Sequence, residues 1–401
     1  MTECNQETFA FTAHLSRRVE AGFTAGQVSS DGGALLLREV ERRINLLGRL
    51  AGCFRDGRNQ DLVEHKLSEM LAQRIYGLAL GYEDLNDHEQ LRSDPLLGLL
   101  SGKRKLEQPL AGKSTLNRLE LTGRSKRYHK ISYSAEAIDR LLVDLYIESH
   151  AVMPSEVVLD LDATDVPLSG HQPERFFHGY YDGYCYLPLY IFAGDQLLCA
   201  RLRPANQDAA AGSVEEASRI VAQLRGRWPQ VKIVLRAESG FCREALMAWC
   251  ENNSVDYVFG LRRNQRLRRI VGAQMHQAHR LHQSSGKAAR VFAEFDYQTH
   301  KSWSRARRVV AKAGVPGKRS LLAGVEGRAS RQGREPTLRR HFTHAAAMGR
   351  AGFIREVLLR TRRNGEPHQG ADVPVRRPAV DRRDEGQSAQ AVLLRVGLHA
   401  G

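Results

Sequence analysis

The sequence predicts an α/β protein in which a helical N-terminal part precedes a sheet with flanking helices. From residue 34 to 148, apolar residues recur at helical spacing between capping and turn residues. From Ser155 the pattern changes to short apolar and β-branched runs that alternate with helical segments. From about Gly314 the chain is rich in Arg and Gly and has neither period, which predicts a basic, largely disordered tail over residues 314–401.

The first 150 residues are expected to form an all-helical domain. Residues 1–26 are expected to be weakly structured, and Ser29-Ser-Asp-Gly-Gly33 offers an N-cap for the first helix. Gly81 and Pro95 then punctuate the helical pattern. The expected helices cover residues 34–40, 61–80, 84–92, 114–121 and 134–148.

Basic residues gather near the end of this domain and again after the last strand of the sheet. Such clusters are typical of contact with DNA phosphates, and an ordinary solvated face is the alternative. The formal net charge of +15 also favours nucleic acid as the partner. The candidates for DNA binding are Lys103, Arg104, Lys105, Lys113, Arg118, Arg262 and Arg263, with Arg124, Lys126, Arg127 and Lys130 beside the first group.

The segments after Ser155 follow the order β-β-β-α-β-α-β. This is the order of a ribonuclease-H-like sheet, in which the first and fourth strands lie side by side. Two more strand patterns follow, at 290–297 and 303–312. The strands of the sheet are expected at 156–165, 176–192, 196–203, 231–238 and 257–261, and its helices after Ser213 and at 244–251.

Carboxylates stand at the ends of two of these strands. Asp160, Asp162 and Asp165 close the first run, and Glu238 closes the fourth. Carboxylates gathered at strand ends hold Mg²⁺ in many phosphoryl-transfer enzymes, and a solvated acidic strand end is the alternative. If the first and fourth strands are neighbours, Asp162 and Glu238 meet at one end of the sheet, the geometry for two metal ions ~3.5–4 Å apart.

Other features of the chain exclude several classes of protein. The six cysteines form no Cys-x-x-Cys pair, which argues against a structural zinc site and fits a reducing cytosol. The polar N-terminus and the lack of a run of ~18 apolar residues predict a cytoplasmic protein with no signal peptide and no membrane span. The tyrosines of the second strand region are interpreted as strand packing, with a base-stacking platform as the alternative. They are Tyr180, Tyr181, Tyr184 and Tyr186.

These residues resemble the DDE transposases of bacterial insertion sequences, specifically the thirteen-eighty group. Matching stretches run from about Thr24 to Ala313, and several are long and idiosyncratic. They include Leu159-Asp-Leu-Asp-Ala-Thr-Asp165, Arg175-Phe-Phe-His-Gly-Tyr-Tyr-Asp-Gly-Tyr-Cys-Tyr-Leu-Pro-Leu-Tyr190, Leu235-Arg-Ala-Glu-Ser-Gly-Phe241, Tyr257-Val-Phe-Gly-Leu261 and Ser302-Trp-Ser-Arg-Ala-Arg-Arg308.

The resemblance implies a ribonuclease-H-like catalytic domain over residues 151–268 and the start of a β-rich insertion over 269–313. It implies DNA cleavage and strand transfer with two Mg²⁺ ions, which Mn²⁺ can replace, held by Asp, Asp and Glu. Here the first Asp is placed at Asp162, with Asp160 and Asp165 as second choices, and the second carboxylate at Glu238. The implied partners are double-stranded DNA, as terminal inverted repeats and target, and a second copy of the chain in the nucleoid.

Two departures from the family pattern put activity in doubt. The fourth strand of the family reads Arg-Ala-Asp-Ser-Gly-Phe, and this chain has Glu238 in the Asp position. The third acidic residue belongs to a late helix carrying Tyr-Cys-Ala-Arg-Gly-Glu-Met-Glu-Asn-Arg-Ile-Lys-Glu, which is missing. Permitted codons for Leu358–Ala371, read one base later, encode Tyr-Cys-Ala-Arg-Gly-Glu-Met-Glu-Asn-Arg-Ile-Lys. We therefore hypothesise that a frameshift near Ala313 makes residues 314–401 out-of-frame text. The copy is then inactive, and the alternative function is a non-catalytic DNA-binding remnant.

Overall fold

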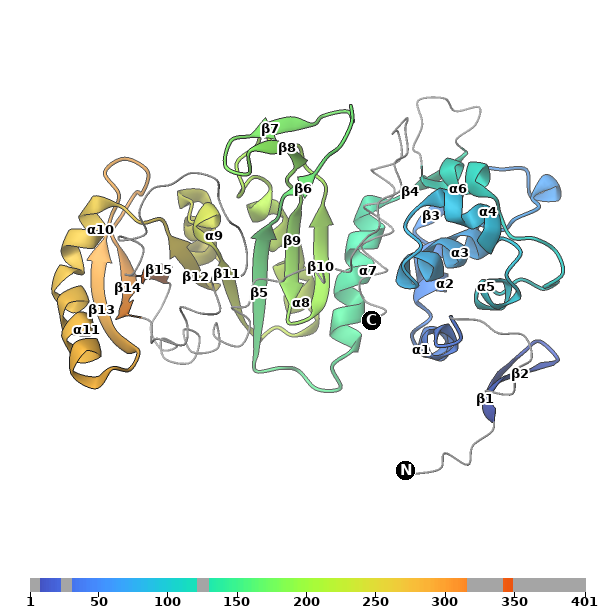
Figure 1. Ribbon diagram of the computed structural model, residues 1–401, viewed down its shortest axis with the longest axis horizontal. Coiled ribbons are helices and arrows are strands. Elements are labelled where there is room, and N and C mark those ends of the chain that lie inside the picture. Colours follow the sequence, from blue (N-terminus) through green and yellow to red (C-terminus); the bar gives the residue numbers. More distant parts are fainter. Residues whose placement is uncertain (1–7, 23–30, 121–129, 316–341, 349–401) are drawn as a thin grey trace.

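The computed structural model describes residues 8–22, 31–120, 130–315 and 342–348 (Figure 1). Its helices are α1 (Ala34–Ile44), α2 (Leu46–Ala51), α3 (Leu67–Ala79), α4 (His88–Leu91), α5 (Pro95–Leu100), α6 (Lys113–Glu120), α7 (Ala135–Glu148), α8 (Ser213–Arg227), α9 (Glu244–Asn252), α10 (Gln265–Ile270) and α11 (Gly272–Ser285). Short 3-10 turns are η1 (Gln60–Leu62), η2 (Leu85–Asp87) and η3 (Ser239–Phe241).

The strands form one large sheet and three small ones within these residues. They are β1 (Thr8–His14), β2 (Arg17–Gly22), β3 (Phe54–Asp56), β4 (Ile131–Tyr133), β5 (Glu156–Ala163), β6 (Val166–Pro167), β7 (Phe176–His178), β8 (Gly183–Tyr186), β9 (Leu189–Ala193), β10 (Gln196–Arg201), β11 (Lys232–Ala237), β12 (Asp256–Leu261), β13 (Ala289–Tyr297), β14 (Arg307–Val315) and β15 (Phe342–Met348).

The large sheet has the strand order β10-β9-β5-β11-β12-β15-β14-β13 in the described part of the chain. β5 pairs with β11 and β11 with β12 in parallel, whereas β9 and β10 continue the sheet by antiparallel pairing on the other side of β5. The predicted adjacency of the first and fourth strands is therefore confirmed. The arrangement is a mixed α/β fold.

The core lies on the face of the sheet that α8 and α9 cover. Along β5 every second residue is buried, including Val157, Leu159 and Leu161. Because successive residues of a strand point to opposite faces, Asp160 and Asp162 lie on the other face. α8 contributes a buried apolar stripe at helical spacing, as the sequence predicts. Its core residues are Ala217, Ile220, Val221 and Leu224.

The N-terminal part contains strands as well as the predicted helices. β1 and β2 form an antiparallel hairpin within residues 1–26, where we expected little structure, and β3 pairs with β4. The hairpin is held by α1, since Arg38 donates to the Thr12 carbonyl at 2.8 Å and Thr12 Oγ1 donates to Glu39 at 2.6 Å. These contacts join distant residues, and β3 and β4 have three residues each. Neither feature leaves a local period in the sequence.

The predicted second strand at 176–192 is broken into β7, β8 and β9. A turn with a positive φ of 53° at Asp182 and a proline at Pro188 interrupt the run. β6, β8 and β7 pair as a separate three-stranded sheet, which we call the flap and define as residues 166–186. The flap stands beyond the end of β5 (Figure 1).

β13 and β14 form an antiparallel hairpin that α11 packs against, and β15 joins this hairpin to β12. β15 belongs to the region that we predicted to be a tail without strand period, so that expectation is wrong for residues 342–348. The rest of the predicted tail, from 316 to 341 and from 349 to 401, lies outside the described residues, and the predicted domain boundaries stay a prediction. No described helix is both long enough and apolar enough to cross a membrane.

Candidate functional site

Charged side chains pair across β5 and β11 on the face opposite the core. Glu156 lies opposite Lys232 in the register, and their side chains form an ion pair of 3.1 Å. Four residues further on, Asp160 lies opposite Arg236 and forms a two-pronged ion pair, with Nη2 donating to Oδ2 at 2.6 Å. Up to this point, each acid of β5 faces a base of β11.

The pattern reverses at the next pair on this face. The register ends at Leu161 opposite Ala237; the next residue of β5 is Asp162, and the residue that directly follows β11 is Glu238. Both side chains are exposed, and no Lys, Arg or His among the described residues forms an ion pair with either. Two like charges directly across a strand pair are destabilising. We call this end of the sheet the carboxylate edge, defined by Asp162 and Glu238.

Local contacts hold both carboxylates at the edge. Thr164 Oγ1 donates to Asp162 Oδ2 at 2.8 Å, which orients that carboxylate after the strand ends. Glu238 keeps an extended backbone, with ψ near 178°, before η3 begins. Gly260 of β12 packs against this backbone so closely that a Cβ there would lie 2.9 Å from the Ser239 nitrogen. The position therefore requires glycine, and β12 presses directly on the segment that carries Glu238.

Asp160 does not fit the ligand role that the sequence left open to it. Both of its oxygens accept hydrogen bonds from Arg236, and these bonds raise the pKa of the guanidinium against the opposing effect of partial burial. A carboxylate held by a bidentate arginine has its lone pairs committed. Of the two residues that share a face, Asp162 is the one left open at the edge.

The carboxylate edge suits a hard divalent cation. Mg²⁺ is usually bound through one or two carboxylates together with water and substrate phosphates, and Asp162 and Glu238 supply such a pair. In the part of the chain that the structure describes, no group of three or more His, Cys, Asp or Glu side chains is placed to hold a metal. The edge therefore fits a two-carboxylate site.

The predicted DNA-binding residues fall into two groups, and the structure removes one residue, Lys103, from the first group. Lys103 is only 5% exposed, and its Nζ donates to the Pro109 carbonyl at 2.7 Å, so it is not available to a phosphate. Arg104, Lys105, Lys113 and Arg118 are exposed, although Lys113 Nζ also donates to Asn86 at 3.1 Å. Arg124, Lys126 and Arg127 lie outside the described residues.

Arg262 and Arg263 form the second group and are exposed at the carboxylate edge. They directly follow β12, which runs parallel to β11, so both arginines leave the sheet at the end where Glu238 lies. The sequence indicated their charge, and the parallel pairing of β11 with β12 brings them to the edge.

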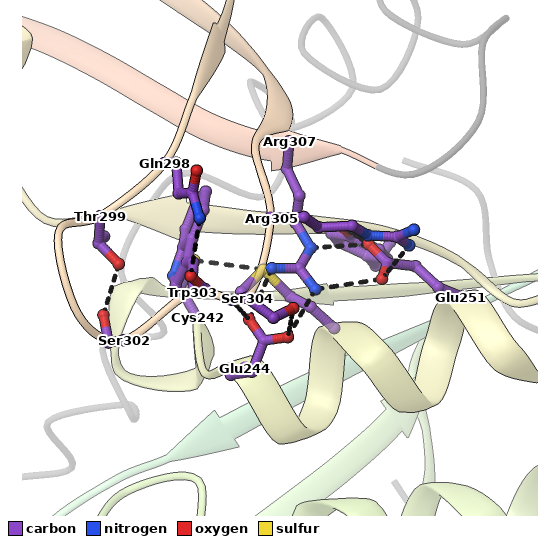
Figure 2. Close-up of polar contacts among 12 residues, drawn as sticks. Cys242, Glu244, Glu251, Gln298, Thr299, Ser302, Trp303, Ser304, Arg305 and Arg307 are labelled. Atoms are coloured by element: carbon purple, nitrogen blue, oxygen red, sulfur yellow. Dashed lines mark hydrogen bonds and ion pairs between the residues drawn. The ribbon is translucent and has the colours of Figure 1, made fainter.

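A second group of carboxylates lies behind the sheet, and sequence reasoning missed it (Figure 2). Arg307 of β14 points between Glu244 and Glu251 of α9 and donates to both, at 2.7 and 3.0 Å to Glu244 and at 2.7 and 3.1 Å to Glu251. Tyr257 also donates to Glu251 at 2.7 Å, and the Arg307 guanidinium lies 5.6 Å from the Trp303 ring centre. We call Arg307, Glu244 and Glu251 the arginine cluster.

Every member of the arginine cluster has a partner, and Arg305 adds a further ion pair to Glu251. The Arg307 side chain is 2% exposed, and the bonds to both acids raise its pKa although burial opposes them. The bond from Arg307 lowers the pKa of Glu244 to about 2. The seven-residue spacing of the two acids, two turns on one face of a helix, is the only signal in the sequence that could have predicted this cluster.

Comparisons with known proteins identify the family of this chain. A family model described as "Transposase DDE domain group 1" matches residues 11–325. No curated protein matches the chain. A solved structure, the cryo-EM structure of a piggyBac transposase synaptic complex with hairpin DNA, is similar at 9% identity over 91% of this chain and 72% of that chain, with a TM-score of 0.41 that carries no argument by itself. Members of the DDE transposase family generally use divalent metals. Because the family model covers most of its length, the chain belongs to the DDE transposase domain group 1 family.

Proposed function

We propose that this chain is an insertion-sequence transposase of the thirteen-eighty group, with Asp162 and Glu238 as its catalytic carboxylates for DNA cleavage and strand transfer. The observation that carries the proposal is the reversal of charge pairing on β5 and β11. Acid faces base at Glu156–Lys232 and Asp160–Arg236, and the residues that follow the last paired position on the two strands are both acids, Asp162 and Glu238. An arrangement that is unfavourable alone becomes favourable when a cation lies between the carboxylates.

The roles of the residues follow from their positions. Asp162 and Glu238 would hold Mg²⁺ or Mn²⁺, which supplies Lewis-acid activation of the attacking oxygen and neutralises charge on the phosphate. Thr164 orients Asp162, and Arg236 keeps Asp160 out of the site. Arg262 and Arg263 would contact phosphates of double-stranded DNA beside the edge. A homodimer on DNA is part of the same proposal.

Glu238 sets the efficiency that we expect. A glutamate is one methylene longer than the aspartate of the family pattern, so its oxygens lie about 1 Å further from the strand, and a misplacement of that size can lower a rate by ~10²-fold. Because Gly260 packs closely against the Glu238 backbone, β11 has little room to shift and bring the longer carboxylate back into position.

A second candidate function is a non-catalytic DNA-binding remnant. It is favoured by the lack of a third acid beside the edge among the described residues. The hypothesised frameshift, for which permitted codons of Leu358–Ala371 allow a second reading, favours it as well. In that case the exposed arginines still bind DNA, while cleavage is lost. Such a remnant would occupy the terminal repeats of the element and compete with an intact copy.

The decisive experiment has two arms. The coding DNA is sequenced beyond Ala313 and read in all frames, and the chain is then assayed on DNA that carries the sequences flanking its gene, with Mg²⁺, Mn²⁺ or EDTA. Metal-dependent cleavage that Asp162→Asn abolishes supports the enzyme. Salt-sensitive binding without cleavage, together with an open second frame, supports the remnant. A chain that fails to bind DNA contradicts both candidates.

A further inference from the structure

A cavity of about 380 Å³ lies among the helices of the N-terminal part of the chain. Its walls come from α1, α2, α3 and the end of α5 with the turn after it, and His14 at the end of β1 lines it as well. None of its lining residues belongs to the large sheet, so the cavity is separate from the carboxylate edge (Figure 1). Many small-molecule sites have volumes of roughly 300–1,000 Å³, and this cavity is large enough to be one.

Two buried hydroxyl groups belong to the wall of this cavity. Tyr76 of α3 and Ser101 after α5 both line it, and they are only 4% and 5% exposed. In the part of the chain that the structure describes, neither hydroxyl has a hydrogen-bond partner. A buried polar group without a partner costs free energy, so each such group in a folded protein needs an explanation. Burial also raises the pKa of the Tyr76 hydroxyl, which therefore stays protonated and able to donate at neutral pH.

The start of α3 faces the same cavity. Lys66, Ser68 and Glu69, which are the N-cap residue and part of the first turn, all line it. The first N–H groups of a helix have no partner within the helix, and a lysine ammonium has no acceptor with which to cap them. These groups give the start of a helix a partial positive charge, and anions bind there. The beginning of α3 thus supplies donors for a negatively charged ligand.

The charged side chains of the cavity also favour an anion. Arg42 of α1 and Lys66 are exposed, and neither forms an ion pair within the described residues. The two acids that line the cavity already accept hydrogen bonds from the backbone. Glu41 accepts from the Leu47 N–H at 2.9 Å, and Glu69 accepts from the Lys66 N–H at 3.4 Å. Two cations are therefore open to a ligand, whereas both acids are engaged.

The remaining walls indicate what kind of anion fits. Leu47, Leu99 and Leu100 line the cavity and offer an apolar surface to the organic part of a ligand. A double-stranded DNA carries its phosphates on the outside of a wide duplex. Such a duplex cannot enter a cavity of this volume to reach the recessed hydroxyls of Tyr76 and Ser101. A small molecule that combines a phosphate with an organic group matches both kinds of wall.

We propose that this cavity binds a small phosphate monoester. Arg42, Lys66 and the first N–H groups of α3 hold the phosphate, and the hydroxyls of Tyr76 and Ser101 complete the polar contacts. Residues of α1, α3, the α5 turn and β1 line one cavity, so the bound ligand joins these elements and stabilises them. The proposal needs neither a metal ion nor DNA, and it does not depend on the role proposed for the carboxylate edge.

The test measures ligand binding to the full chain in a phosphate-free buffer at constant ionic strength. Inorganic phosphate and adenosine monophosphate are the probes, and adenosine is the control that lacks a phosphate. Titration calorimetry should show one site for adenosine monophosphate and weaker binding of inorganic phosphate. Both should raise the melting temperature, whereas adenosine should leave it unchanged.

Two adjacent arginines of α1 provide a matched pair of variants. Arg42 lines the cavity, whereas Arg43 is equally exposed and does not line it. Arg42→Met should weaken the binding of adenosine monophosphate about tenfold, because a hydrogen bond to a charged group is lost. Arg43→Met removes the same charge from the same helix and should leave the affinity unchanged.

The variant Tyr76→Phe separates a binding role from a structural one. It removes a hydroxyl that has no partner among the described residues, so the ligand-free chain should be at least as stable as wild type. Its affinity for adenosine monophosphate should nevertheless fall several-fold. A variant that is less stable without ligand and keeps its affinity would give the hydroxyl a structural role and contradict the site.

Other outcomes overturn the proposal as well. A wild-type chain that binds neither phosphate nor adenosine monophosphate shows that the cavity has no such ligand. Equal losses of affinity in Arg42→Met and Arg43→Met reduce the effect to general surface charge. If duplex DNA displaces adenosine monophosphate and binds more weakly to Arg42→Met than to Arg43→Met, the phosphate belongs to DNA. DNA cleavage at the carboxylate edge is assayed without these ligands, so either proposal can fail while the other stands.

Discussion

The carboxylate edge and the arginine cluster contain the same chemical groups in opposite circumstances. At the edge, Asp162 and Glu238 are exposed acids on adjacent strands with no basic partner among the described residues. In the cluster, Glu244 and Glu251 share a guanidinium that is 2% exposed and receive hydrogen bonds from neighbouring residues as well. One pair of acids is satisfied by the fold, and the other is not.

The difference indicates what each pair does. A buried network in which every member has a partner holds elements together, and here it ties β14 to α9. Two exposed like charges on neighbouring chain segments destabilise the fold slightly, and a cation bound between them would remove that cost. Carboxylates alone therefore do not mark a site, and their pairing does.

The largest effect is expected from Arg307→Met in the arginine cluster. The variant leaves Glu244 without its cation and leaves Glu251 with Arg305 alone. Removing one partner of a buried ion network typically costs ~3–5 kcal/mol. Urea unfolding at pH 7 measures the loss. Arg308→Met, which removes a pair with the exposed Glu294, is the matched control on the same strand and should change stability little. Equal losses in the two variants would show that the cluster is not special.

The second effect is the acid sensitivity of the cluster. The pKa of Glu244 is lowered to about 2 from 4.5 in the folded chain, chiefly by the hydrogen bond from Arg307. A depressed folded pKa contributes stability that is present above the unfolded pKa and is lost as the pH falls through the folded value. The urea concentration at the unfolding midpoint should therefore decrease as the pH is lowered from 4.5 to about 2. In the Glu244→Gln variant this decrease should be smaller. A variant that titrates like wild type would place the acid sensitivity elsewhere.

An intermediate effect is expected where β12 meets the edge. Gly260→Ala places a methyl group 2.9 Å from the Ser239 nitrogen, and the backbone that carries Glu238 must move. Overpacking of this kind costs ~1–3 kcal/mol, and it should also weaken the stabilisation by Mg²⁺ or Mn²⁺. Thermal unfolding with and without metal measures both. Gly226→Ala, where a Cβ meets nothing within 4 Å, is the control.

The smallest effect is the most informative about the edge. Asp162→Asn removes a like-charge opposition, so the metal-free variant should gain ~0.2–1 kcal/mol of stability. The same variant should lose the rise in melting temperature that divalent metal gives the wild-type chain. Asp160→Asn should show the opposite result: the metal-free variant should be less stable, because the ion pair with Arg236 is lost, and its melting temperature should still rise with divalent metal. An Asp162→Asn variant that is destabilised and still responds to metal would make the edge an ordinary strand end.

The sequence by itself determined most of the strands of the large sheet and the adjacency of its first and fourth strands, but neither the break of the second strand nor β15. Apolar alternation, caps and the order of elements are local signals, and the parallel pairing of β5 with β11 follows from them. It also placed an acid at the end of each of these strands. It could not choose between Asp160 and Asp162, because residues two apart on a strand share a face and differ only in what lies opposite.

Only the tertiary structure decided which residue lies opposite each of these side chains. Arg236 forms an ion pair with Asp160 and leaves Asp162 open. Lys103 donates to the Pro109 carbonyl and so does not belong to the basic surface. Arg307 contacts two acids that lie 56 and 63 residues away in the sequence. The open rings of Tyr180 and Tyr184 likewise depend on how the flap folds back on itself, since a strand period reads the same whether a side chain is covered or not. The physical reason is that periodicity reports the face on which a side chain lies, while pairing and burial depend on residues that only the folded chain brings together.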